Sequence, residues 1–286
     1  MRFATIERNG RPEACALVDG KLMPLGGAGF TDLISLIAGG ADALDRARRL
    51  IDGRGPETNG ALAFESAALC APVPRPPKII CIGLNYRDHA AESKMAIPDV
   101  PTVFSKYATS VTGHRSPIVL PRNSVKPDYE AEFAVVIGKG GRHIAEDAWR
   151  EHVFGYTIVN DVSARDFQMA TTQWMMGKTF DTFAPMGPVI VTADEIADPH
   201  NLHIALRLNG EVLQDSNTSN LIFGVGKLIA FLSSVFTLEP GDVISTGTPA
   251  GVGFARKPPV WLKGGDTVEV EVEGIGTLMN PVVAEA

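Results

Sequence analysis

The stretch Asp128-Tyr-Glu130-Ala-Glu132-Phe-Ala-Val-Val-Ile-Gly138 places two glutamates at the start of an apolar run. The run from Ala131 to Ile137 predicts a buried strand, on which successive side chains point to opposite faces. Glu130 and Glu132 would then project side by side from one face. Close, buried carboxylates repel each other and resist ionisation, and a divalent cation would relieve both problems. Spacing alone leaves an exposed edge strand with two solvated glutamates equally open.

A third acid follows the next apolar strand, which is expected over Phe154–Val159. The segment Gly155-Tyr-Thr-Ile-Val-Asn160-Asp161 would place Asp161 at the strand end. Three carboxylates without a nearby pair of cysteines or histidines form an oxygen-ligand set. Such a set suits Mg²⁺, Mn²⁺ or Ca²⁺ rather than Zn²⁺. The sequence leaves open whether Asp161 meets the glutamates or serves in a turn or as a helix cap.

An imidazole and a carboxylate are paired in His89-Ala-Ala-Glu92. At positions i and i+3 of a helix the two side chains face the same way. The carboxylate would orient the ring and stabilise its cation, which improves a general base. A solvated helix surface is the commoner origin of such a pair. The other five histidines show no comparable partner and are expected to be structural or on the surface.

Further polar side chains lie near these acids. Lys178, between apolar neighbours, could act on an oxyanion or a carboxylate, or could be an ordinary exposed lysine. Arg165 and Gln168 could hold a substrate carboxylate, or could lie on a helix surface with Arg165 paired to an acid. The glycine-rich loop 245–253 lacks the Walker A and dinucleotide patterns. Its backbone N–H groups could bind a carboxylate, or its glycines could only serve a tight turn.

Composition limits the class of protein. The chain has 286 residues, 45% hydrophobic and 21% charged, which is typical of a globular protein. A net charge of −7 argues against nucleic-acid and anionic membrane partners. Three cysteines give no disulfide framework, the first residues form no apolar leader, and the longest apolar stretch is too short to span a bilayer. A cytoplasmic location is expected.

The chain is expected to have two parts. Residues 1–70 form a small α+β domain whose hairpins turn at Asn9-Gly10 and Asp19-Gly20. Residues 71–77, with four prolines, form a stiff linker, and residues 78–286 form the main domain. A long helix is predicted over Asn220–Val235, with Thr218 or Ser219 as its N-cap. The fold class is α+β with a mixed, mostly antiparallel sheet core.

Five ordered motifs together resemble the fumarylacetoacetate hydrolase superfamily over about residues 78 to 283. The small N-terminal part also looks like that of the two-domain bacterial members. The motifs are Ile82-Gly-Leu-Asn-Tyr86-x-x-His89-Ala-x-Glu92, Asp128-Tyr-Glu130-x-Glu132, Gly155-Tyr-Thr-x-x-Asn160-Asp161-Val-Ser-x-Arg165-Asp-x-Gln168, Gly177-Lys178-x-x-Asp181 and Pro240-Gly-Asp242-x-Ile-x-Thr-Gly-Thr248-Pro-x-Gly251.

The resemblance implies a β-sandwich roll core, a homodimer and a bound Mg²⁺ or Mn²⁺, with Ca²⁺ as a further candidate. By this resemblance the metal ligands are Glu130, Glu132 and Asp161. The water-activating pair and active-site lysine are His89, Glu92 and Lys178, with the pair on a helix that orders as a lid. The positions near substrate are Arg165, Gln168 and Thr248.

The function expected from this resemblance is metal-dependent hydrolysis of a C–C bond in a β-diketo acid. An acylpyruvate would give pyruvate and a carboxylic acid. The same scaffold also suits oxaloacetate decarboxylation, isomerisation or hydration of 2-oxo-dienoates, and ureidoglycolate cleavage, because each reaction uses an enolate or a related intermediate. A binding protein without turnover is the alternative from a different class.

Overall fold

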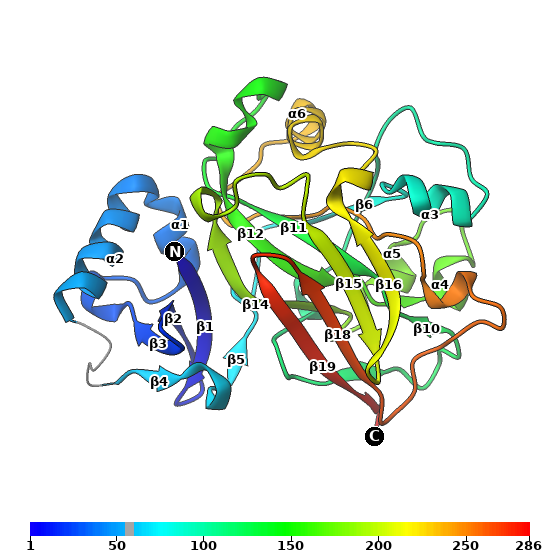
Figure 1. The fold of residues 1–286 in the computed structure, drawn as a ribbon, viewed down its shortest axis with the longest axis horizontal. Coiled ribbons are helices and arrows are strands. Elements are labelled where there is room, and N and C mark those ends of the chain that lie inside the picture. The colour runs from blue at the N-terminus through cyan, green and yellow to red at the C-terminus, as the bar shows by residue number, and fades with distance from the viewer. Residues whose placement is uncertain (55–59) are drawn as a thin grey trace.

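The computed structural model describes residues 1–54 and 60–286, and two β-sheets dominate it (Figure 1). The helices are α1 (Leu33–Ala38), α2 (Gly40–Arg54), α3 (Arg87–Glu92), α4 (Arg165–Gln168), α5 (Met175–Lys178) and α6 (Val225–Val235). The strands of the first half are β1 (Arg2–Arg8), β2 (Arg11–Val18), β3 (Lys21–Pro24), β4 (Leu62–Ala63), β5 (Leu69–Cys70), β6 (Ile79–Gly83), β7 (Thr102–Ser105), β8 (Val111–Thr112), β9 (Ile118–Leu120), β10 (Pro127–Asp128) and β11 (Ala131–Ile137). Those of the second half are β12 (Val153–Asn160), β13 (Ser163–Ala164), β14 (Ala184–Thr192), β15 (His203–Leu208), β16 (Glu211–Asn217), β17 (Val243–Ser245), β18 (Thr267–Val272) and β19 (Gly276–Ala284).

The larger sheet has twelve strands, ten of them in the order β4-β3-β2-β1-β14-β12-β11-β17-β6-β7. The second sheet has five strands in the order β16-β15-β18-β19-β9. Strands β11, β12 and β14 pack against β15, β18 and β19, and their apolar side chains form the main core. Most neighbours are antiparallel, while β6–β17, β8–β14 and β9–β19 are parallel. The expected mixed α+β fold is confirmed.

Strands β11 and β12 form the centre of the larger sheet and carry the acids. Every residue of β11 and β12 is buried, as expected for strands covered on both faces. Ala131 pairs with Asn160, and Glu132 pairs with Val159. This register brings the start of β11 beside the end of β12. Glu130 and Asp161, one residue outside each strand, therefore become neighbours.

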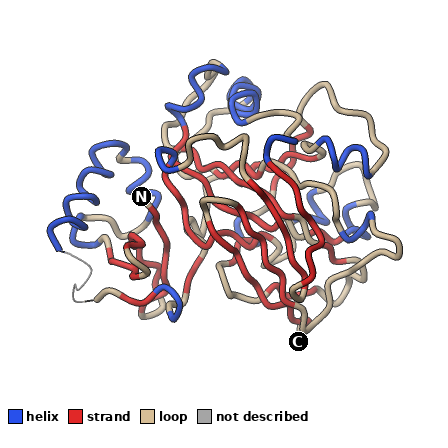
Figure 2. The backbone as a smooth tube through the Cα atoms, in the orientation of Figure 1, coloured by secondary structure: helices blue, strands red, loops and turns tan. Residues whose placement is uncertain are grey.

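The N-terminal part continues the larger sheet. Strand β1 pairs with β14 through Arg2–Val191 and Phe3–Ile190, on the side opposite its hairpin partner β2 (Figure 2). A second apolar cluster joins Phe3 and residues of α1 to Ile190 of β14. The domain limits 1–70 and 78–286 therefore stay a prediction, with one sheet running across both parts. Within residues 1–54 and 60–286, no helix is long and apolar enough to cross a membrane.

The long helix begins later than its sequence predicts. Helix α6 starts at Val225 with Gly224 as its N-cap, whereas Thr218 and Ser219 lie in a short 3₁₀ turn, so the predicted start and cap are wrong. The cause is a residue distant in the sequence. Asn85 accepts the N–H of Phe223 on its side-chain oxygen, at 2.8 Å, and the N–H of Ile222 on its backbone oxygen, at 2.7 Å. These bonds hold the chain extended where local helix propensity favours a helix.

A buried histidine outside the three-carboxylate cluster, His114, makes the folding stability depend on pH. It is 5% exposed, and its Nδ1 accepts the backbone N–H of Met279 at 3.1 Å, which requires the neutral ring. Burial, helped by Arg115, lowers the pKa of His114 from 6.5 to about 4. The unfolded chain therefore binds the proton of His114 more tightly than the folded chain does. The contribution of His114 to folding stability is complete above pH 6.5 and is lost as the pH falls toward 4.

We expect up to about 3 kcal/mol of unfolding free energy to be lost through His114 across that interval. The measurement is urea denaturation of the parent protein and of His114→Asn, whose amide oxygen can still accept the Met279 N–H. The asparagine variant should lose less stability between pH 7 and pH 4.5. Equal losses would exclude His114 as the cause.

Candidate metal and active site

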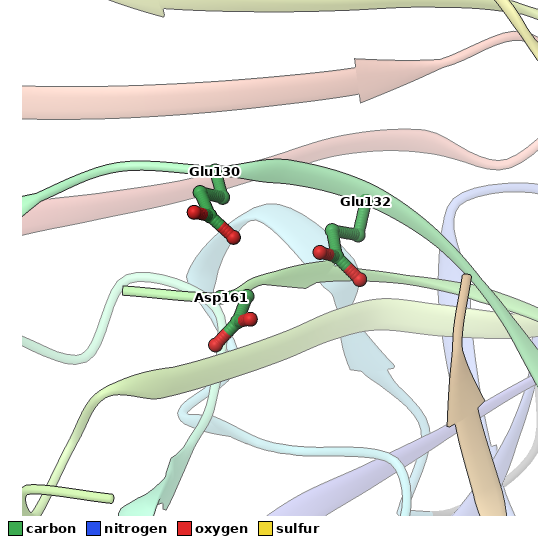
Figure 3. Close-up of side chains that lie close together, drawn as sticks. All are labelled: Glu130, Glu132 and Asp161. Carbon is green, nitrogen blue, oxygen red and sulfur yellow. The ribbon is translucent and has the colours of Figure 1, made fainter. Parts of the chain in front are cut away.

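Three carboxylates converge at the junction of β11 and β12. Figure 3 shows Glu130 and Glu132 extending from one segment toward Asp161 on its neighbour. One oxygen of each lies within 4.8 Å of the others, and the residues are 5%, 1% and 0% exposed. The open question of whether Asp161 meets the glutamates is thus answered. They are buried, so the reading of two solvated glutamates on an edge strand is excluded.

Two buried lysines hold Asp161 in place. Lys178 of α5 donates to Asp161 Oδ2 at 2.7 Å and to Glu130 Oε2 at 2.8 Å. Lys106, which follows β7, donates to Asp161 Oδ1 and to the Val162 carbonyl, the latter at 3.0 Å. Both ammonium groups are nearly inaccessible to water. Lys178 is therefore a buried, paired lysine rather than an exposed one.

Arg165 is also buried and paired. Its Nε donates to Asp128 Oδ2 at 2.8 Å, and its Nη2 lies 2.7 Å from Glu130 Oε1. Its Nη1 donates to Gln168 Oε1 at 2.8 Å. These contacts orient both predicted substrate-binding side chains of α4. The guanidinium is thereby fixed at the wall of the site by Asp128 and Glu130.

The two glutamates sit in opposite electrostatic environments. Burial raises the pKa of Glu130, but Lys178 and Arg165 outweigh it and lower that pKa to about 2. Burial, followed by the charges of Asp161 and Glu130, raises the pKa of Glu132 well above its ordinary value. Glu132 Oε2 accepts only neutral donors, the Ser245 hydroxyl at 2.5 Å and the Gly247 N–H at 3.0 Å. Glu132 is thus the carboxylate most in need of a cation.

These residues fit a divalent metal ion. The buried cluster holds four carboxylates, counting Asp128, against three cations, and the excess negative charge lies at Glu132. A divalent cation among Glu130, Glu132 and Asp161 would reverse that excess and leave the site receptive to an anionic ligand. The oxygen-only donor set suits Mg²⁺, Mn²⁺ or Ca²⁺. The identity of the metal stays a prediction.

The imidazole–carboxylate pair forms on helix α3. His89 Nδ1 lies 3.3 Å from Glu92 Oε2, and both side chains are partly accessible. The preceding residue, Asp88, anchors the helix by accepting from the Ser216 hydroxyl at 2.5 Å. Because Nδ1 faces Glu92, Nε2 is the ring nitrogen left to exchange a proton with substrate.

The glycine-rich loop does bind carboxylates, and they belong to the protein itself. Gly247 N–H donates to Glu132 at 3.0 Å, Gly251 N–H donates to both oxygens of Glu92, at 3.0 and 3.1 Å, and Gly253 N–H donates to Asp128 at 2.8 Å. Gly247 and Gly251 also adopt φ of 103° and 102°, which favours glycine. One loop therefore positions acids from three parts of the site.

A single pocket of about 450 Å³ gathers the predicted residues. Eight of the nine line it, and Asp161 lies beneath them, fully buried. The eight are His89, Glu92, Glu130, Glu132, Arg165, Gln168, Lys178 and Thr248. Thr248 accepts from the side chain of Gln214 at 2.8 Å, so its hydroxyl is held toward the protein. The catalytic and ligand roles of these residues stay predictions.

Sequence reasoning missed three buried residues. Lys106 follows the edge strand β7 and carries no local motif, so only its contact with Asp161 reveals it. Gln214 reaches across from β16 to accept the Ala131 N–H at 2.9 Å. Asp128 lies inside the quoted acidic motif, and the available signal was an acid two residues before the glutamate pair.

Lys106→Met should destabilise the protein, because Asp161 loses one of its two ammonium partners. We expect a loss of roughly 3 kcal/mol in the free energy of unfolding of EDTA-treated protein. The loss should shrink with saturating Mn²⁺, since the cation neutralises Asp161. Urea denaturation measures both values, and Lys139→Met, at an exposed lysine, is the control. Equal destabilisation with and without Mn²⁺ would contradict the prediction that Lys106 and the metal ion both neutralise Asp161.

The family model described as fumarylacetoacetate (FAA) hydrolase C-terminal matches residues 78–283, and the chain belongs to the fumarylacetoacetate hydrolase superfamily. Among curated proteins, the chain is similar to mitochondrial oxaloacetate tautomerases. The Homo sapiens protein of that name is 49% identical over 246 residues, covering 85% of this chain and 77% of its own length. The Xenopus laevis protein is also 49% identical, covering 85% and 76%.

Solved structures agree over the full length. A putative HpcE protein from Mycobacterium smegmatis has a TM-score of 0.88 and 35% identity, with both chains fully covered. A maleylpyruvate hydrolase from Sphingobium sp. SYK-6, solved with manganese(II) and pyruvate, has a TM-score of 0.84 and 28% identity, again with full coverage. By these similarities the chain groups with the hydrolases and isomerases of this superfamily. The cytoplasmic location stays a prediction, since the named tautomerases are mitochondrial.

Proposed function

We propose that the protein is a divalent-metal-dependent tautomerase that interconverts the keto and enol forms of oxaloacetate or a related 2-oxo acid. One observation carries the proposal: the His89–Glu92 pair and the buried carboxylates open into the same pocket. A proton-transfer group and a site for a charge-stabilising cation therefore line the same cavity. The names of the similar curated proteins support oxaloacetate as the reference substrate.

Glu130, Glu132 and Asp161 would hold the metal. When bound, Mg²⁺ or Mn²⁺ supplies Lewis acidity and positive charge that favour the enol form of a 2-oxo acid. Arg165 and Lys178 add fixed positive charge beside Glu130. These charges are already in place when the 2-oxo oxygen of the substrate becomes more negative.

The proton moves through His89. Nε2 takes a proton from C3 of the substrate, and the C–H electron pair becomes the C2–C3 double bond. The carbonyl π electrons shift to the 2-oxo oxygen, which then receives the proton from His89, so that the enol is complete and the imidazole is neutral again. Glu92 stabilises the imidazolium through Nδ1, and the Gly251 N–H fixes Glu92 in turn. The reverse sequence converts the enol into the keto form.

The test follows the ultraviolet absorbance of enol-oxaloacetate after addition of EDTA-stripped protein with or without Mg²⁺ or Mn²⁺. The expected result is metal-dependent ketonisation above the buffer rate, without pyruvate release. Pyruvate formation from oxaloacetate would instead identify a decarboxylase. Ketonisation at the buffer rate with every metal would refute the tautomerase proposal.

The second candidate is hydrolysis of an acylpyruvate to pyruvate and a carboxylic acid. The similar maleylpyruvate hydrolase that was solved with manganese(II) and pyruvate supports it. His89 would then deprotonate a water that attacks the distal carbonyl, and Lys178 would stabilise the resulting negative charge. Metal-dependent pyruvate release from an acylpyruvate panel tests this candidate. Metal-induced stabilisation without turnover of any substrate would favour a binding protein.

We also propose that the enzyme works as a homodimer in the cytoplasm, on the basis of its sequence resemblance and composition. Light scattering of the protein as it elutes from a size-exclusion column measures its mass, which is compared with the 30.5 kDa of one chain. A monomeric mass would refute the dimer. Fractionation of the native cells tests the location.

A further inference from the structure

The lining of the pocket is of two chemical kinds. Its polar part includes Glu130, Glu132, Lys178 and Arg165. The rest includes an apolar wall that is rich in aromatic and methionine side chains. The wall consists of Met95, Phe104, Met169, Trp174, Val252 and Phe254. A 2-oxo acid whose carboxylate and 2-oxo oxygen face the polar residues would place its C3 substituent against the neighbouring apolar wall, since Lys178 Nζ lies 5.1 Å from the ring centroid of Phe104.

Trp174 is the best-positioned member of the wall. Its ring packs edge-on against Phe104, with centroids 5.8 Å apart. It also lies against Gly83 at the end of β6, where an added Cβ would come within 2.3 Å of the indole ring. Glycine at that position therefore leaves space for the ring. Two partners fix a large, half-buried aromatic surface beside the pocket.

The cations of the pocket are already engaged. Among the described residues that line it, Arg165 and Lys178 are the only arginine and lysine. Arg165 is paired with Asp128 and Glu130, and Lys178 with Glu130 and Asp161. An uncharged aromatic substituent needs no further cation and would bury its surface against the apolar wall.

We propose that the same site also tautomerises arylpyruvates, with Trp174 as the residue that selects the aromatic substituent. This inference rests on the proposed function and extends its substrate class. The step follows the same course: the benzylic C3–H bond breaks, its electrons form the C2–C3 double bond, and its proton passes through His89 to the 2-oxo oxygen. No oxidant or second substrate is needed.

The experiment compares phenylpyruvate with oxaloacetate. Keto–enol conversion of each is followed in the ultraviolet with Mn²⁺-loaded protein, after subtraction of the buffer rate. The variants are Trp174→Ala, Trp174→Phe and the control Met176→Ala, an exposed methionine of α5 outside the pocket lining. Melting temperatures with Mn²⁺ show whether each variant is folded and loaded.

The parent protein should tautomerise both acids. Trp174→Ala should lower the ratio of kcat/KM for phenylpyruvate to that for oxaloacetate about tenfold, mainly through KM, as expected when about 1.4 kcal/mol of aromatic contact is lost. Trp174→Phe should recover most of the ratio, and Met176→Ala should leave it unchanged.

Two results would overturn this inference alone. One is oxaloacetate turnover without phenylpyruvate turnover by the parent protein. The other is a ratio that Trp174→Ala does not change. Failure of the parent protein on both acids would overturn the proposed function, and the inference with it.

Discussion

Replacing Glu132 by glutamine should stabilise the metal-free protein and abolish its response to metal. Glu132 is buried and accepts bonds only from Ser245 and Gly247, without a cation of its own. A glutamine oxygen can accept the same two bonds while removing the charge. We expect the free energy of unfolding in EDTA to rise by on the order of 1 kcal/mol. The parent protein should instead gain about 2.7 kcal/mol from Mn²⁺ at one hundred times its Kd.

The matched variant Glu130→Gln should change stability in the opposite direction. Glu130 is the shared partner of Lys178 and Arg165, whose charges lower its pKa to about 2. Its replacement should lower the free energy of unfolding by roughly 3–5 kcal/mol, because two buried cations lose their carboxylate partner. Urea denaturation with EDTA or Mn²⁺ measures both variants, and Glu211→Gln on the exposed hairpin is the control. Retention of the full Mn²⁺ response by either site variant would refute the metal assignment.

His89→Ala should lower kcat for metal-dependent tautomerisation by roughly 10²–10⁴-fold, the usual contribution of one general base. The metal-induced rise in melting temperature should remain, because His89 stands outside the three carboxylates. Stopped-flow ultraviolet absorbance with enol-oxaloacetate measures the rate. Loss of both the rate and the metal response would assign His89 a role in metal binding instead.

The substitution Glu92→Gln tests whether Glu92 acts on His89 by orienting its ring or through its negative charge. The amide can still accept the Gly251 N–H and contact His89 Nδ1, but it cannot stabilise the imidazolium. Its kcat should therefore fall less than that of His89→Ala. A rate unchanged from the parent protein would show that Glu92 only anchors the loop.

The predictable part of the fold is the part with strong local patterns. The strand over Ala131–Ile137 was predicted with the observed limits, because seven consecutive apolar or acidic side chains fit a fully buried strand. The start of α6 was missed, because the bonds that delay it come from Asn85, 138 residues before Phe223 in the sequence. Sequence periodicity carries no record of such a contact.

The candidate site also has features that local sequence predicts and features that depend on distant contacts. Glu130 and Glu132 share a face because of strand geometry, which two-residue spacing predicts. Their meeting with Asp161 depends on the β11–β12 register, which fixes Ala131 opposite Asn160. The role of Lys106 depends on where the chain passes after an exposed edge strand. Neither the register nor that path is determined by residues within one local window.

The pairing of β1 with β14 has a consequence for how the protein folds during synthesis. Phe3 leaves the ribosome early, but its partner Ile190 is made only after most of the chain. At roughly 5–20 residues per second, the first strand waits on the order of 10–40 s for its neighbour. During that interval the edge of β1 at Arg2 and Phe3 is available for incorrect pairing, whereas Thr5 and Ile6 can pair with β5. Contacts this distant in sequence also slow folding in the completed chain. The hairpin of β1 and β2 therefore keeps part of one edge unpaired until β14 has been made.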